Sequence, residues 1–191
     1  MSKRIAFLSA AALGVLALTA TIAAPVSAQD KMKSEMSGEK TVMVGGAAMF
    51  PSKNIIQNAV NSKDHTTLVA AVKAAGLVET LEGKGPFTVF APTNAAFGKL
   101  PAGTVDTLVK PENKATLTKI LTYHVVAGKL EASDLSDGKK LKTVQGEELT
   151  VKKADGKVMI VDAKGGSSTV TIPNVNQSNG VIHVVDTVLM P

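Results

Sequence analysis

The hydrophobic pattern of the sequence changes near Tyr123, and this change limits the chain to folds that join a helical half to a sheet. Before Tyr123, apolar residues recur at helical spacing at Leu68, Val69, Val72 and Leu77. After it, β-rich runs alternate with Gln-Gly, Asp-Gly and Gly-Gly turns, which is typical of antiparallel hairpins. These runs are residues 141–144, 148–152, 158–161, 169–172 and 181–189. The two halves predict one α+β domain.

The helical half contains one strand-like interruption. Residues 54–60 predict a short helix, and Asp64 is expected to cap a longer one, which places His65 at an exposed helix start. Residues 87–91 are β-rich and bounded by prolines, which predicts a short buried strand. Helical segments return over residues 94–121, with Thr93 or Asn94 as the cap.

The N-terminus predicts export. Lys3 and Arg4 precede an apolar run over residues 5–24, and the small residues Val26-Ser27-Ala28 follow as a cleavage site. We therefore expect residues 1–28 to be a signal peptide, and the mature chain to lie in the periplasm or outside the cell. The chain has no cysteine to carry a lipid, so no stable membrane anchor is expected.

Residues 29–49 mix charges, Ser and Gly without a sustained period, and we expect them to form a flexible tail before a domain at residues 50–191. This segment holds four methionines, at positions 32, 36, 43 and 49. Thioethers in an exported segment could bind Cu(I), a soft cation. A tail that merely contains methionine is the simpler interpretation.

Composition and motifs exclude several functions. Base readout uses arginine, and binding of single-stranded nucleic acid uses aromatic side chains as stacking platforms. Arg4 is the only arginine, and aromatic residues are 3% of the chain. No nucleic-acid partner is therefore expected. The motifs GxSxG, GxxxxGK[ST], GxGxxG and HExxH are absent, and the three histidines lie far apart. The sequence therefore predicts neither an enzyme nor a metal or cofactor site.

Three segments, in order, resemble the motifs of one family. They are GPFTVFAPTNAAFGKLP (residues 85–101), the pair Tyr123-His124 in LTYHVVAGKL, and NGVIHVVDTVLMP (residues 179–191). They resemble the first conserved box, the YH motif and the second conserved box of the fasciclin (FAS1) domain. The resemblance covers residues 50–191 and departs from the family at Asn94, where Asp is frequent.

The resemblance implies helices packed on an antiparallel β-wedge or sandwich. It also implies a non-enzymatic, secreted module for cell adhesion that binds a surface or matrix protein or polysaccharide. Tyr123 and His124 are the candidate contact residues, because the YH region of the family has been proposed as a contact site. The alternative is that His124 ties its strand to the corner at Thr93 and Asn94, which would make the motif structural. His183 is expected to be a structural strand residue.

One copy of a weak site has no avidity, so adhesion would require a homo-oligomer or a multivalent partner. The alternative function is a periplasmic protein that binds a small ligand, or Cu(I) through its methionines.

Overall fold

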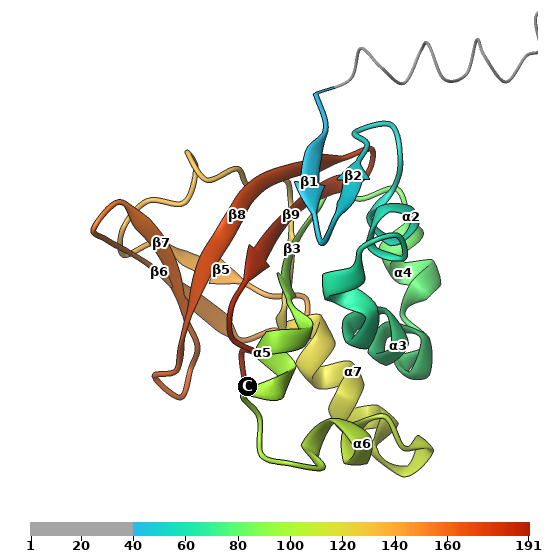
Figure 1. The fold of residues 1–191 in the computed structure, drawn as a ribbon. Helices are drawn as coiled ribbons and strands as arrows, with labels where there is room; N and C mark the ends of the chain where they lie inside the picture. The colour runs from blue at the N-terminus through green and yellow to red at the C-terminus, as the bar shows by residue number, and fades with distance from the viewer. Residues whose placement is uncertain (1–39) are drawn as a thin grey trace, which may run out of the picture.

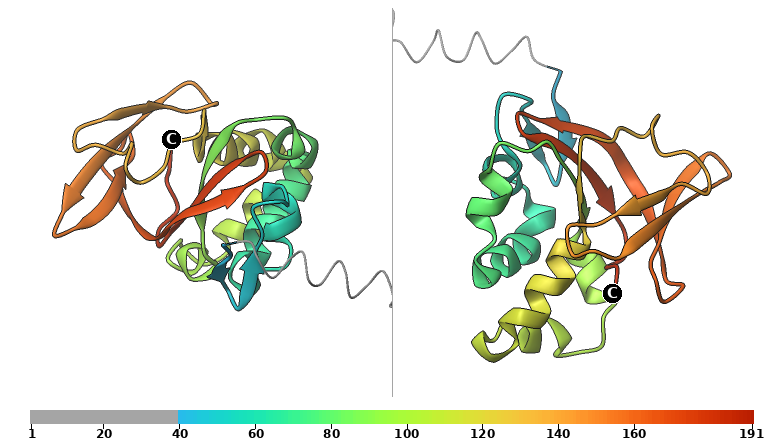
Figure 2. Two further views of the ribbon diagram at one scale, coloured as in Figure 1. Left: turned by 90° about the horizontal axis from the view of Figure 1, so that it is seen from above. Right: turned by 180° about the vertical axis from the view of Figure 1, so that it is seen from behind.

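The computed structural model describes residues 40–191 (Figure 1). The expected signal peptide at residues 1–28, and residues 29–39 of the expected tail, lie outside the described residues. In the described part, helices gather on one side of the central strands and β-hairpins extend from the other side, as the views in Figure 2 also show. The α+β class predicted from the sequence is confirmed.

The helical side is built from short helices with local start and stop signals. The Asn54 side chain accepts a hydrogen bond from the backbone of Gln57, and the Gln57 side chain returns one to Asn54, which forms a capping box. Gly76 ends the helix at Thr66–Ala75 in a left-handed conformation. The helices are α2 (Ile55–Ala59), α3 (Thr66–Ala75), α4 (Val78–Glu82), α5 (Asn94–Gly98), α6 (Thr104–Leu108) and α7 (Lys114–Tyr123), with 3-10 turns at Lys63–His65 and Pro111–Asn113.

The expected cap at Asp64 is wrong. Asp64 lies inside the 3-10 turn that precedes α3, and the N-cap residue of α3 is His65, whose side chain makes no capping hydrogen bond. His65, which we expected to be exposed, is 3% exposed, because this turn folds its ring against the helical side of the core.

A seven-stranded sheet forms the rest of the domain. Its order is β4-β3-β9-β8-β7-β6-β5. The pair β3–β9 is parallel, and the other pairs of this sheet are antiparallel. The sheet is therefore mostly antiparallel, whereas we expected it to be antiparallel throughout. The strands are β3 (Phe87–Pro92), β4 (Val125–Ala127), β5 (Lys140–Lys142), β6 (Glu148–Ala154), β7 (Lys157–Val161), β8 (Ser167–Gln177) and β9 (Gly180–Val185).

The sheet curls until its two end strands meet. Val126 of β4 forms a bridge with Thr143, which follows β5. This curling creates two cores. The first contains Val89 and Ile182 and lies between the sheet and the helices, whereas the second contains Phe90, Leu149 and Ile160 and lies inside the curled sheet.

Part of the expected flexible tail is folded. Strands β1 (Val42–Val44) and β2 (Ala47–Met49) form an antiparallel hairpin that packs near α2 and β8 (Figure 1). Val44 and Met49 are each 3% exposed and belong to the first core. The burial of these two side chains stabilises the hairpin. Strands of three residues are too short to show a hydrophobic period, so the sequence did not predict them.

The two methionines of this hairpin give the first prediction. Met49→Ala is expected to lower the free energy of unfolding by about 2 to 5 kcal/mol, because it removes a buried side chain from a packed core. Met43 is 59% exposed, so Met43→Ala should change that free energy by less than about 0.5 kcal/mol. Urea denaturation of residues 29–191 measures both variants, and equal effects would contradict the folded hairpin.

Candidate functional site

The corner between β3 and α5 holds the first motif. Thr93 is the N-cap of α5, and its hydroxyl accepts a hydrogen bond from the Ala96 N–H at 3.2 Å. The Asn94 side chain reaches the start of α3, where its Oδ1 accepts from the Thr67 N–H at 3.0 Å and its Nδ2 donates to the Lys63 carbonyl at 2.8 Å. These are neutral amide contacts, so Asn at this position joins two helix starts without a negative charge.

Tyr123 and His124 lie at the end of α7 rather than in a strand. Tyr123 is its last residue and His124 is its C-cap, so their side chains do not alternate across a sheet. They are 0% and 2% exposed. The Tyr123 hydroxyl accepts a hydrogen bond from the Ala163 N–H at 2.9 Å. Because both side chains are buried, they present almost no surface to a partner, and a contact patch near Tyr123 and His124 stays a prediction.

His124 fastens the C-terminal segment to α7. Its Nδ1 lies 2.9 Å from the Ile120 carbonyl, and its Nε2 accepts a hydrogen bond from the Leu189 N–H at 3.0 Å. The imidazole is therefore neutral with its proton on Nδ1. The expectation that His124 is structurally bonded agrees with this geometry, but its partners are not Thr93 and Asn94, because Asn94 turns toward α3 instead.

A carboxylate next to this histidine completes the fastening. Asp162 Oδ2 accepts from the Met190 N–H at 3.2 Å, while its Oδ1 accepts from the Gly166 N–H at 2.7 Å and the Lys164 N–H at 3.0 Å. Asp162 is 9% exposed. The last residues of the chain are thus held by the YH motif and by the β7–β8 turn together.

His183 is a strand histidine, and it is fully buried in β9. Its ring stacks on Phe90 with 5.7 Å between ring centroids. Nε2 lies 2.8 Å from the Leu130 carbonyl, so it donates there, and Nδ1 faces the Asn174 N–H at 3.4 Å. This residue connects the central strands to the segment after β4.

Asn179 is a connecting residue that our sequence reasoning missed. Its Oδ1 accepts from the Ile55 N–H at 3.1 Å, and its Nδ2 donates to the carbonyls of Leu81 and Gly83 at 2.7 and 2.9 Å. The next residue, Gly180, runs so close to β3 that a Cβ there would overlap the Phe87 carbonyl oxygen. The two residues open the third motif segment, but the sequence pattern does not reveal the distant partners of the Asn179 amide.

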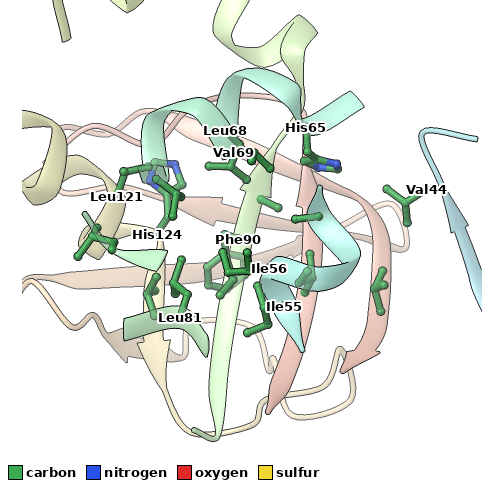
Figure 3. A pocket seen from close by; sticks show the side chains of 18 of the residues that line it. Val44, Ile55, Ile56, His65, Leu68, Val69, Leu81, Phe90, Leu121 and His124 are labelled. Carbon is green, nitrogen blue, oxygen red and sulfur yellow. The ribbon is translucent and has the colours of Figure 1, made fainter. Parts of the chain in front are cut away.

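An apolar cavity of about 40 Å³ lies between the helices and the central strands (Figure 3). His65 and His124 lie on its wall among aliphatic side chains such as Ile56 and Leu121. The His65 Nδ1 lies 2.9 Å from the Ser62 hydroxyl, while its Nε2 is buried without a hydrogen-bond partner. Burial lowers the pKa of His65. Ligand pockets usually measure several hundred Å³, so this cavity has room for a few water molecules rather than for an organic ligand.

Residues 40–191 lack both a metal-binding cluster and a membrane-spanning helix. No group of three or more His, Asp or Glu side chains in this range could hold a metal ion. No helix in this range is long and apolar enough to span a bilayer.

The protonation of His124 gives a pH prediction. Burial lowers the pKa of this group from 6.5 to about 4, although the bond to the Ile120 carbonyl opposes the shift. The unfolded chain therefore takes up the proton first, and the stabilisation that is complete above pH 6.5 is lost as the pH falls toward 4. For His124 alone the free energy of unfolding should fall by about 2 kcal/mol between pH 7.5 and 5.0.

Burial also lowers the pKa of His65 and His183, so the wild-type loss should exceed that of His124 alone. Urea denaturation at the two pH values measures the loss, and His124→Gln should show a smaller one. A variant with the full wild-type dependence would show that His124 does not titrate as described.

Asn179→Ala gives a prediction about the missed residue. It leaves the Ile55 N–H and two carbonyls without their partner, so the free energy of unfolding should fall by at least about 2 kcal/mol. Asn61→Ala is the matched control, because this exposed side chain donates one bond, to the Gln57 carbonyl, and should cost less than about 1 kcal/mol. Thermal melting of both variants decides, and similar melting temperatures would contradict the assigned role.

Comparisons with known proteins agree with this architecture. A family model described as the fasciclin domain matches residues 63–191. Protein sll1483 of Synechocystis sp. is 51% identical over 153 residues, which cover 80% of this chain and 82% of that protein. Cell surface glycolipoprotein MPB83 of Mycobacterium bovis is 41% identical over 153 residues, which cover 78% of this chain and 64% of that protein.

Among solved structures, a FAS1 domain pair from the insect cell adhesion molecule fasciclin I aligns with a TM-score of 0.66 at 20% identity. The alignment covers 74% of this chain and 52% of that chain, so the chain spans about half of the domain pair. At this identity the similarity concerns the fold. The matched family model covers more than half of the sequence, and the chain belongs to the fasciclin domain family.

Proposed function

We propose that this protein is a secreted, non-enzymatic module that binds a protein or polysaccharide at a cell surface or in a matrix. The proposal rests on one observation: the polar side chains that stand out in the family motifs form hydrogen bonds inside the domain. Thr93, Asn94, Tyr123, His124 and His183 are each hydrogen-bonded within the domain. Recognition is therefore left to the exposed surface.

The state of His124 supports a role without catalysis. A general base needs a free nitrogen within reach of a substrate proton. Both nitrogens of His124 are engaged by backbone groups, and burial lowers its pKa to about 4. The most perturbed titratable group of the motifs thus holds the C-terminal segment and does not face solvent.

The names of similar proteins support a surface location. One relative is a cell surface glycolipoprotein, and the solved domain pair comes from a cell adhesion molecule. Secretion through the N-terminal signal that the sequence predicts would agree with such a location. A single domain gains avidity through a multivalent partner or through a homo-oligomer.

The alternative, a small-ligand or Cu(I)-binding protein, has less support from the structure. Met49 pairs with Val42, so these two side chains share the buried face of the hairpin. Met43 follows Val42 in the same strand and therefore points to the opposite, exposed face. The two methionines cannot bind one ion together unless the hairpin unfolds. Met32 and Met36 lie outside the described residues, and the apolar cavity is too small for an organic ligand.

An affinity capture tests the proposal. Immobilised residues 29–191 should capture a protein or polysaccharide from envelope or matrix fractions, and a variant with Met32, Met36 and Met43 changed to Leu should capture it equally. Capture of nothing at concentrations of hundreds of micromolar would overturn the proposal. Cu(I) binding that the Leu variant loses, together with no capture, would favour the alternative.

A further inference from the structure

An open groove lies at the seam where the curled sheet closes. The strands β4 and β5 meet at the bridge between Val126 and Thr143 and diverge from there. The space between them measures about 430 Å³. Its lining combines the apolar side chains of Val126, Ala127, Leu130 and Leu141 with three lysines. Val126, Ala127 and Leu130 belong to the second motif segment, but neither Tyr123 nor His124 lines this groove.

The backbone of β5 offers hydrogen-bonding groups to the groove. Leu141 lies opposite Leu149 of β6, and the Val151 N–H donates to the Lys139 carbonyl at 2.7 Å. In an antiparallel ladder the residues alternate in direction, so the N–H and carbonyl groups of Lys140 and Lys142 point away from β6. The Val144 N–H, which follows the same alternation, donates to the Val125 carbonyl at 2.7 Å. The bridge between Val126 and Thr143 directs the Lys142 carbonyl toward Ala127 of β4. The Lys140 N–H and carbonyl lie beyond this bridge and are the part of the β5 edge that is suited to pair with another strand.

The lysines give the groove a positive charge. Lys140 forms an exposed ion pair with Glu148 at 3.3 Å, and Lys139 donates to the Asp134 carbonyl at 2.7 Å. Lys142 has neither an ion pair nor a hydrogen bond from its side chain to any residue of the range 40–191. Glu148 lies opposite Lys142 in the ladder and is also the ion-pair partner of Lys140, so these two lysines share one carboxylate.

The wall of the groove is held in place before any partner arrives. The Leu130 N–H donates to the Thr88 hydroxyl at 2.9 Å, and the Leu130 carbonyl accepts from His183 at 2.8 Å. Both anchors lie on the central strands β3 and β9. A preformed groove reduces the ordering cost that a partner strand must overcome.

We propose that this groove binds an extended, acidic peptide segment of a partner protein, which adds as a strand to the exposed edge of β5. The proposal rests on the proposed function and names its partner class and its site. Strand addition gains affinity from backbone hydrogen bonds and specificity from alternate side chains. Here the inward side chains of the segment would contact Leu130 and Ala127, and the outward carboxylates would pair with Lys140 and Lys142. An anionic polysaccharide would match the lysines but not the strand edge.

The probe is an acetylated octapeptide of alternating Glu and Val. In a titration of residues 29–191 followed by amide NMR shifts, the largest changes should fall on residues 127, 130 and 139–143. A second octapeptide with alternate backbone nitrogens methylated has the same charge but cannot form the ladder. It should bind at least tenfold more weakly, and equal binding of the two peptides would overturn strand addition.

Charge is tested by paired variants. K140E/K142E should weaken binding of the Glu-Val peptide at least tenfold. K152E/K153E is the matched control, because these exposed lysines of β6 lie outside the groove lining and the change in net charge is the same. If the control weakens binding equally, the effect is general electrostatics and the site is wrong. Polygalacturonate that displaces the peptide and shifts the same amides as strongly would favour a polysaccharide instead.

The same variants separate this inference from the proposed function. Capture of an envelope partner that K140E/K142E retains in full would refute the groove while leaving surface binding intact. Peptide binding at the groove, together with no capture by the wild-type protein, would refute the surface function and not the strand addition. Circular dichroism of each variant confirms that it is folded.

Discussion

The parallel pairing of β3 with β9 is the contact on which the rest of the domain depends. These two strands come from the first and the last motif of the chain, and each has a core on both of its faces. Val89 and Ala91 face the helices while Phe90 faces the inside of the curled sheet, and Ile182 and Val185 divide in the same way. Such strands are buried on both faces, which is why residues 87–92 and 180–185 are almost continuously apolar.

Local signals in the sequence were sufficient for much of the fold. The hairpin turns, the cap at Thr93 and the buried run at 87–91 could all be predicted, because each depends on residues close together in sequence. The parallel direction of β3 and β9 could not, since it is set by how about 90 residues between them are packed. The folded hairpin at 42–49 was missed for the same reason, because Met49 is buried by α2 and β8 rather than by its neighbours in sequence.

The candidate site was predicted less well than the fold, and the reason is physical. The family motif drew attention to Tyr123 and His124, but a sequence pattern does not tell whether a polar side chain faces solvent or a buried backbone group. His124 bonds to Leu189, 65 residues away, and Asn179 bonds to Ile55, 124 residues away. Groups that satisfy distant backbone atoms must keep their chemistry, since their loss leaves a buried N–H without a partner. The motif can therefore be read as a requirement of the scaffold.

The closure of the sheet links the scaffold to recognition. A fully closed barrel has no edge strands, whereas this sheet closes at the bridge between Val126 and Thr143 and leaves β5 with an edge beside a groove. Lysines on an edge strand oppose pairing with a second copy of the same edge, because like charges would face each other. The charge that prevents self-pairing at β5 also favours a strand that carries carboxylates. If binding occurs at this edge, a homo-oligomer formed through it is disfavoured, and the avidity of a single domain must come from repeated sites on the partner.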